Sequence, residues 1–197
     1  GFEKPHAPWK TQKKYHDLYN PEDIELPKTW DQLKKGADFD HIMPDTKKNK
    51  DFTETQIRNS IAAYYANVTS MDENVGKLIT AIKETGLYEK TIIIYTSDHG
   101  ESLYEHGLIE KHCFFEGAVG IPLIIYCPGL KVKEKTCSCL ASLVDIMPTL
   151  SEMSGFGKIE GIDGISLLDA MVTGVYPERH IYSEFYTHKP QRMILTD

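Results

Sequence analysis

The longest periodic segment of the sequence lies between residues 54 and 86. Apolar side chains recur there at steps of three and four residues, from Ile57 through Ile61 to Ile82. This spacing places them on one face of an amphipathic helix. Gly86 supplies a stop signal. About 30 helical residues extend roughly 45 Å, so the fold has to accommodate one long helix.

Two short apolar runs follow, at residues 91–97 and 122–127. Successive positions are apolar in both, which fits central strands of a parallel sheet that helices cover on both faces. Helix, strand, loop and strand in this order predict an α/β layered fold with a mostly parallel sheet.

The C-terminal third of the chain carries weaker signals. Residues 142–154 predict a second helix, which Pro148 should kink or end early. Runs that begin at His180 and at Arg192 have strand character, and the second reaches Asp197 without an evident partner.

Residues 1–55 contain several prolines and no sustained period, which predicts a long, mostly irregular excursion. Such loops usually shape a site. Its aromatic residues either line the approach to a pocket or pack the segment against the long helix. They are Trp9, Tyr15, Tyr19 and Trp30.

Composition excludes several classes of protein. The chain has 197 residues, 41% hydrophobic and 26% charged, which fits one globular domain, alone or with an appendage, and excludes a disordered chain. No apolar run approaches the roughly 20 residues of a membrane span. The net charge of −7 argues against a nucleic-acid partner. It does not exclude a small anionic substrate, because nearby lysines and a metal ion set the local potential.

The four cysteines form no C-x-x-C pair, which argues against a zinc knuckle or a thioredoxin-type redox site. We interpret them as buried or idle thiols. They favour a reducing, cytoplasmic compartment only weakly over the periplasm or secretion. The chain begins at Gly1, and no signal peptide is visible.

Polar residues cluster where the first apolar run ends, at Asp98-His99-Gly100. Ligands of open α/β sheets bind beyond the carboxyl ends of the strands. A carboxylate and an imidazole on consecutive residues form a partial shell for a divalent cation, and the other ligands must come from elsewhere. In isolation this triplet is more often a turn in which Asp98 caps the next segment.

The surrounding motifs make the triplet more specific. SDHGESLYEHG is followed by Lys111 and FEGAVGIPLIIYCPG, and GFEKPHAPW, SLVDIMPTL, GIDGISLL, IYSEF and RMILTD occur in matching order. Together they resemble the C-terminal half of the sulfatase catalytic domain, in the alkaline phosphatase superfamily. The resemblance implies that residues 1–175 are the C-terminal portion of an α/β catalytic domain. Residues 176–197 would begin a small, truncated antiparallel C-terminal subdomain.

The same resemblance implies roles for particular side chains. Asp98 and His99 would ligate a divalent cation, calcium in the first place, with manganese and magnesium as alternatives. His6 and Lys111 would be catalytic and contact the sulfate and its bridging oxygen. Lys4 would be a further substrate-binding residue, although a lysine or histidine in these segments could also be an ordinary surface residue.

Physical chemistry is consistent with these roles. A sulfuryl group in transfer carries negative charge, which fixed cations stabilise. One ion pair at about 4 Å contributes about 4 kcal/mol at an effective dielectric constant of 20, or roughly three decades in rate. Histidine exchanges a proton near neutral pH, so His6 could protonate the departing alkoxide. Glu101 and His106 are expected to support the site, Glu101 as a structural acid rather than a base, although His106 could equally be a surface residue.

The nucleophile of the family is missing from the sequence. Sulfatases convert the cysteine or serine of C/S-x-P-S-R to formylglycine, and neither this motif nor the paired acidic metal ligands occur here. We therefore expect a piece of a larger sulfatase whose formylglycine lies upstream, in the missing N-terminal part of the same domain. Alone, it should be inert.

Three other functions share some of these motifs. A phosphonate monoester or phosphodiester hydrolase of the superfamily shares the D-H-G strand end, the P-H-x-P segment and the later lysine. A phosphoethanolamine or glycerophosphate transferase shares S-D-H-G-E-S-L, but Lys111 and KPHAPW argue against it. A non-catalytic binding module would keep the scaffold without the nucleophile. The expected partner is a small anionic sulfate ester.

Overall fold

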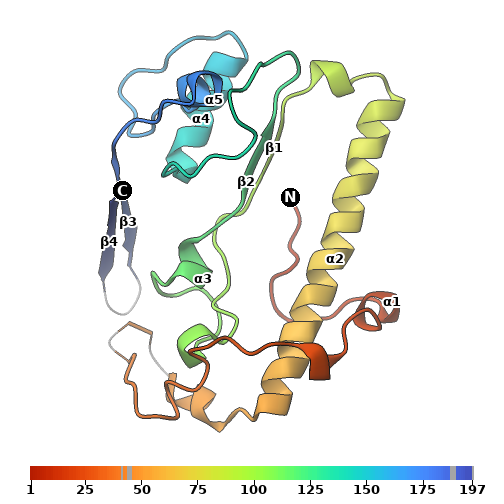
Figure 1. The fold of residues 1–197 in the computed structure, drawn as a ribbon, viewed down its shortest axis with the longest axis vertical. Coiled ribbons are helices and arrows are strands. Elements are labelled where there is room, and N and C mark those ends of the chain that lie inside the picture. Colours follow the sequence, from red (N-terminus) through yellow and green to blue (C-terminus); the bar gives the residue numbers. More distant parts are fainter. Residues whose placement is uncertain (41, 44–45, 187–189, 197) are drawn as a thin grey trace. The chain divides into compact units, whose positions relative to one another are not determined.

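The computed structural model describes residues 1–40, 42–43, 46–186 and 190–196 (Figure 1). The chain forms two compact units. The first comprises Gly1–Tyr88 and His99–Ile121, and the second comprises Glu89–Asp98 and Pro122–Asp197. Each unit is therefore made of two separate stretches of sequence.

The helix α2, Glu54–Glu84, is the main element of the first unit (Figure 1). Its start is fixed by a capping box in which the Thr53 hydroxyl accepts from the backbone N–H of Gln56 at 3.2 Å. The side chain of Gln56 accepts in return from the backbone N–H of Thr53 at 2.9 Å. Beyond its end, Gly86 takes a left-handed φ of 71°. The predicted long helix is confirmed.

Only the first half of α2 is buried. Its buried side chains are those of Ile57, Ile61, Ala62, Ala66 and Asn67. Against them pack the short helix α1, Lys13–His16, and a 3-10 helix, Pro21–Asp23. A further 3-10 helix, Thr46–Asp51, precedes α2.

The aromatic residues of the N-terminal segment bind it to α2. Trp9 contacts Tyr64 edge-on, with ring centroids 5.7 Å apart. The hydroxyl of Tyr15 donates to Glu73 at 3.0 Å, and the hydroxyl of Tyr19 lies 2.6 Å from Thr69 Oγ1. Of the two interpretations offered above, packing against the helix is therefore the one observed for Trp9, Tyr15 and Tyr19. The segment is mostly irregular, as predicted, although residues 41, 44 and 45 lie outside the described part.

A second buried cluster covers the loop that follows the first strand. It consists of Leu33, Met43, Leu108, Cys113 and Ala118. The 3-10 helix Glu105–Gly107 and the short helix α3, Glu116–Val119, lie within this region. Apolar burial on both sides of residue 111 thus fixes the backbone that carries the predicted catalytic lysine.

The 3-10 helix Tyr88–Lys90 begins at the last residue of the first unit's longer stretch and leads into β1, Ile93–Thr96. In the second unit, β1 pairs with β2, Leu123–Tyr126 (Figure 1). The two strands are antiparallel, with Thr96 opposite Leu123, so the predicted parallel arrangement is wrong for this pair. A parallel connection must carry the chain back to the start of the first strand, usually through a helix. Here the loop leaves and re-enters at the same end.

Two helices follow this sheet along the chain: α4, Ile146–Met153, and α5, Leu168–Thr173. A 3-10 turn, Leu143–Asp145, precedes α4. Pro148 neither kinks nor ends the helix, contrary to the prediction, because it lies in the first turn. The backbone N–H that proline lacks has no intrahelical partner at that position.

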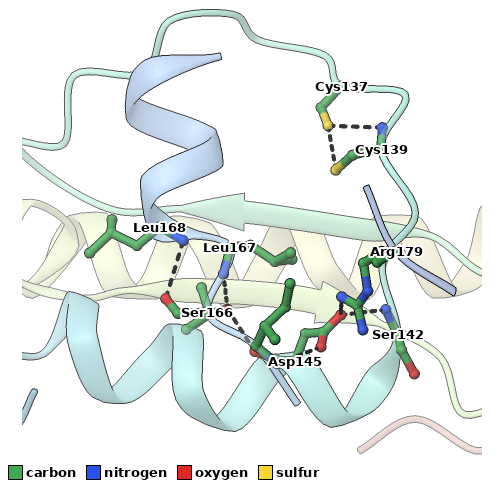
Figure 2. A network of polar contacts seen from close by, with 10 residues as sticks. Cys137, Cys139, Ser142, Asp145, Ser166, Leu167, Leu168 and Arg179 are labelled. Atoms are coloured by element: carbon green, nitrogen blue, oxygen red, sulfur yellow. Dashed lines mark hydrogen bonds and ion pairs between the residues drawn. The ribbon is translucent and has the colours of Figure 1, made fainter. Parts of the chain in front are cut away.

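Asp145 is the polar centre of the second unit (Figure 2). Its carboxylate is fully buried and accepts from the backbone N–H of Ser142 at 2.7 Å and of Ile165 at 3.0 Å. Arg179 donates to the same carboxylate at 2.6 Å. A buried charge is stable only when paired and hydrogen-bonded, so these contacts join three distant segments.

The C-terminal runs form the strands β3, His180–Phe185, and β4, Gln191–Thr196. They pair antiparallel, with His180 opposite Thr196 and Phe185 opposite Gln191. The predicted strands are confirmed, and β4 has the partner that the sequence did not reveal. Residues 187–189 and 197 of the predicted subdomain lie outside the described part, and its boundary at residue 175 stays a prediction. Within the described residues, no helix has the length and hydropathy needed to span a membrane.

Replacement of Asp145 by alanine should destabilise the second unit strongly. Arg179 would lose its ion pair with Asp145, and two backbone N–H groups would lose their acceptor. Breaking a buried pair in this way costs about 3–5 kcal/mol. We expect that loss in the free energy of unfolding measured in urea. Asp163→Ala, at an exposed position, is the control and should stay within about 0.5 kcal/mol of the wild type.

Candidate active site

The loop after β1 has an unusual backbone. Leu103, Tyr104, His106 and Glu110 adopt positive φ values of 43°, 69°, 56° and 71°. Each such residue costs on the order of 1–3 kcal/mol and persists only where its surroundings impose it. Strain of this kind concentrates at functional sites.

Two residues close this loop on itself. The side chain of Glu101 accepts from the backbone N–H of Leu103 at 3.3 Å and from that of Glu110. Ser102, which is buried, donates to the carbonyl oxygen of Glu110 from its backbone N–H at 2.8 Å and its hydroxyl at 2.6 Å. Burial raises the pKa of the Glu101 carboxyl, although the two backbone hydrogen bonds act in the opposite direction. These contacts are structural, and the predicted role of Glu101 in supporting the site stays a prediction.

Gly100 permits a close approach of two backbone segments. Its N–H donates to the carbonyl oxygen of Ala118 at 2.8 Å. A Cβ atom at position 100 would lie 2.1 Å from the carbonyl oxygen of Gly117. No side chain fits there, so the glycine of D-H-G is a packing requirement.

The loop brings Lys111 to His6. Nζ of Lys111 lies 3.0 Å from Nε2 of His6, although the two residues are 105 positions apart. Nδ1 of His6 lies 2.7 Å from the carbonyl oxygen of Ala7. A carbonyl only accepts, so Nδ1 carries the proton and Nε2 accepts from the Lys111 ammonium. Two of the predicted catalytic groups therefore form one hydrogen-bonded pair.

Lys4 supports the segment that carries His6. Its ammonium donates to the carbonyl oxygen of Pro8 at 2.7 Å, and the backbone N–H of His6 donates to the carbonyl oxygen of Glu3 at 3.0 Å. The observed contacts of Lys4 thus shape the turn around His6. Its predicted contact with substrate stays a prediction.

His106 is held by the N-terminal segment. Its ring stacks on Phe115 with centroids 4.1 Å apart, and Nδ1 donates to Gln32 Oε1 at 2.8 Å. Its backbone N–H donates to the hydroxyl of Thr29 at 2.9 Å. These contacts anchor the strained loop, and a direct role in chemistry stays untested.

Asp98 ends the β1 segment of the second unit, and the next residue, His99, returns the chain to the first. Nδ1 of His99 lies 2.8 Å from the carbonyl oxygen of Gly100. Nδ1 must therefore donate, so a metal would be ligated through Nε2. The Asp98 carboxylate accepts from the Ser97 hydroxyl at 3.4 Å. Among the described residues, no group of three or more ligating side chains could hold a metal. That Asp98 and His99 ligate a divalent cation stays a prediction, and the other ligands would have to come from elsewhere.

The contributions of Ser102 and Gly117 to this loop were not predicted from the sequence. A buried serine carries no distinctive sequence signal, because its burial depends on the loop around it. Gly117 could have been identified, since glycine in an otherwise apolar segment often marks a close backbone approach.

Comparisons with known proteins agree with this picture. A family model described as Sulfatase matches residues 2–156. The chain belongs to the sulfatase family. It is 34% identical to arylsulfatase K of Gallus gallus, over 83% of this chain and 29% of the relative. Identity to the choline-sulfatase of Rhizobium meliloti (strain 1021) is also 34%, over 93% of this chain and 36% of that enzyme.

Among solved structures, the phosphonate monoester hydrolase SpPMH from Silicibacter pomeroyi superimposes with a TM-score of 0.77 at 28% identity. The match covers 91% of this chain and 38% of that protein. Such neighbours have the alkaline phosphatase fold, and helices together with two small antiparallel sheets are consistent with part of such a domain. This sulfatase chain spans roughly a third of the length of the relatives it matches.

Replacement of Glu101 should open the strained loop. Glu101→Ala leaves two backbone N–H groups without an acceptor and should lower the free energy of unfolding by about 1–3 kcal/mol. Glu101→Gln keeps one acceptor oxygen and should cost less, as urea unfolding would show. Equal losses of unfolding free energy in the two variants would contradict the role of the Glu101 side chain as the acceptor for these two N–H groups.

The pH dependence gives a second measurement of the same group. The folded-state pKa of Glu101 is raised, so the ionised carboxylate costs stability that the protonated acid does not. The wild type should therefore gain stability relative to Glu101→Gln as the pH falls through the raised pKa towards the usual carboxyl value. A difference that stays constant with pH would be the opposite result.

Proposed function

We propose that this chain is the C-terminal portion of the catalytic domain of a sulfatase that hydrolyses sulfate esters. The observation that carries the proposal is the pair formed by His6 and Lys111, with Nε2 and Nζ 3.0 Å apart. Both groups are solvent-accessible, so an anion can reach them. Membership in the sulfatase family supports the substrate class.

Lys111 stabilises the transferring group by charge. Its ammonium would donate to a sulfate oxygen on which negative charge accumulates in the transition state, where a fixed cation contributes most. The strained loop holds this ammonium in place before substrate binds, so little reorganisation is needed.

His6 and Lys111 together serve the leaving group. The ammonium of Lys111 donates a hydrogen bond to Nε2 of His6. A bridging oxygen that enters between them would receive the hydrogen bond from Lys111. Because Nε2 of His6 is an acceptor here, His6 would first take up a proton from solvent at Nε2 and then pass it to the departing alkoxide. The contact between Nδ1 and Ala7 keeps the imidazole oriented during the transfer.

Asp98 and His99 would contribute two ligands to a divalent cation, calcium in the first place. Such a cation, when bound, neutralises charge on the non-bridging oxygens of the ester. Asp98 would contribute a carboxylate oxygen and His99 its Nε2 atom. The hydrogen bond from Nδ1 to Gly100 would orient the ring for this role.

The nucleophile would come from residues outside this chain. The sequence lacks C/S-x-P-S-R, and the chain covers only 29% and 36% of the two relatives. We therefore infer that the formylglycine belongs to an N-terminal part of the same domain, and that the isolated chain is inactive.

A second candidate is hydrolysis of phosphonate monoesters. Its support is the similarity to SpPMH at a TM-score of 0.77. Sulfate and phosphonate monoesters both present an anionic head with a departing oxygen, so the same lysine and histidine could serve either reaction. A non-catalytic module is the third candidate, and it requires that the complete protein also lack the formylglycine motif.

Substitutions in the complete enzyme test the proposal. Lys111→Ala should lower kcat/KM on 4-nitrophenyl sulfate about 10²–10³-fold, as loss of one transition-state donor does. His6→Ala should affect alkyl sulfates more than 4-nitrophenyl sulfate, because only the alkoxide needs a proton to depart. Lys90→Ala, at an exposed position, is the control and should leave both rates unchanged.

The same assays separate the candidate functions. Higher kcat/KM on sulfates than on matched phosphonate monoesters supports a sulfatase, and the reverse supports the second candidate. Turnover by the isolated chain that Lys111→Ala abolishes would disprove the need for an external nucleophile.

The isolated chain should bind calcium weakly. Two ligands on consecutive residues give little of the six- to eight-oxygen shell that calcium prefers. Calorimetric titration should therefore yield a dissociation constant weaker than about 10⁻⁴ M, the range of loosely held calcium. Asp98→Asn should abolish even that binding. A micromolar site would show that the chain already holds a complete ligand set.

A further inference from the structure

The second unit contains a cysteine pair that the hydrolytic function does not use. The Sγ atoms of Cys137 and Cys139 lie 2.7 Å apart, and both thiols are free (Figure 2). The backbone N–H of Cys139 also donates to Cys137 Sγ at 3.1 Å. Cys137 is exposed to solvent, so of the two alternatives, buried or idle, burial does not apply to this thiol.

We propose that Cys137 and Cys139 form a thiol–disulfide exchange site that reacts with low-molecular-weight disulfides. A disulfide bond joins sulfur atoms at about 2.05 Å, so these two need to approach by less than about 1 Å. Cys137 is the attacking thiol because it is the exposed member. Cys139, which is half-buried, is the resolving thiol.

Hydrogen bonding separates the two thiols in acidity. Burial raises the pKa of Cys137, but hydrogen bonds from the thiol of Cys139, the hydroxyl of Tyr176 and the backbone N–H of Cys139 outweigh it, so the pKa is lowered. Burial and the interaction with Cys137 raise the pKa of Cys139 to about 12. The hydrogen bond that Tyr176 donates to Cys137 raises the pKa of Tyr176 to about 12. The thiolate is the nucleophile in disulfide exchange, so Cys137 reacts first.

The exchange proceeds in two balanced steps. The Cys137 thiolate attacks one sulfur of a disulfide RSSR, a mixed disulfide forms on Cys137, and RS⁻ departs. Cys139 then loses its proton to solvent and attacks the Cys137 sulfur, which expels the second RS⁻. Two electrons pass from the protein to RSSR, and two RSH molecules result after protonation. Once Cys137 is capped, its negative charge no longer raises the pKa of Cys139, which favours the second step.

The buried Asp145 cluster keeps the pair in place (Figure 2). Asp145 holds Ser142, just after Cys139, through a 2.7 Å hydrogen bond. It holds Arg179, just after Tyr176, through the 2.6 Å ion pair. One carboxylate therefore fixes both segments that build the thiol site.

Metal binding explains this geometry less well. Two thiolates on one zinc ion at 2.3 Å each would stand roughly 3.8 Å apart in tetrahedral geometry. The observed sulfur atoms are closer, at 2.7 Å. No third ligating side chain completes a metal group within the part of the chain that the structure describes.

The test uses the chain equilibrated with oxidised and reduced glutathione, quenched with acid, alkylated and digested with trypsin. Cleavage after Lys135 and Lys158 places both cysteines on one peptide, 136–158. We expect this peptide to lose two hydrogens and to resist alkylation. Peptide 112–131, which carries Cys113 and Cys127, is the internal control and should be fully alkylated.

Variants assign the two roles. Cys139→Ser should accumulate glutathione on Cys137, because the resolving thiol is gone. Cys137→Ser should leave Cys139 unmodified. In the reduced wild type at neutral pH, iodoacetamide should alkylate Cys137 at least about tenfold faster than Cys139, and Tyr176→Phe should reduce this difference.

Three results would overturn the proposal. They are a peptide 136–158 that stays fully reduced while peptide 112–131 oxidises, a stable glutathione adduct on wild-type Cys137, and faster alkylation of Cys139 than of Cys137. None of these measurements depends on hydrolytic activity, so the proposal stands or falls separately from the sulfatase assignment.

Discussion

The candidate active site depends on the closure of one loop on itself. Ser102 and Glu101 bind the two backbone polar groups of Glu110, its carbonyl oxygen and its N–H. This closure imposes the left-handed residues and projects Lys111 towards His6. Buried hydrogen bonds are costly to break because the exposed partner keeps its desolvation penalty. The ammonium is therefore positioned by the backbone rather than by its own flexible side chain.

The second unit applies the same physical principle at Asp145. A single buried carboxylate satisfies two backbone N–H groups and one guanidinium. Through Ser142 and Arg179, Asp145 holds the segments that carry the cysteine pair and Tyr176. Asp145 itself performs no chemistry there. In each unit one acid, partly buried Glu101 or fully buried Asp145, holds the segments that carry groups accessible to solvent.

The strands show how tertiary context limits a correct local pattern. Residues 91–97 and 122–127 are apolar on both faces and do contain strands. The inference of complete burial was wrong, since Ile124 is 62% exposed. The other three residues of β2 are partly buried, so the exposure is confined to Ile124. A continuous apolar run reports the propensity to be buried, and neighbouring elements decide whether burial occurs.

The sequence by itself determined the long helix, the strand positions, the family and the identity of the groups at the candidate site, because periodicity and motifs are local properties of the chain. Tertiary structure alone decided the antiparallel pairing of β1 with β2, the tolerance of Pro148 within α4, the 3.0 Å contact between His6 and Lys111, and the approach of Cys137 to Cys139. The strand pairing and the His6–Lys111 contact depend on where a loop returns, whereas Pro148 and the cysteine pair depend on where a helix begins and on the geometry of a local turn. The two distant contacts join residues by long-range closure, whose outcome no local spacing in the sequence specifies.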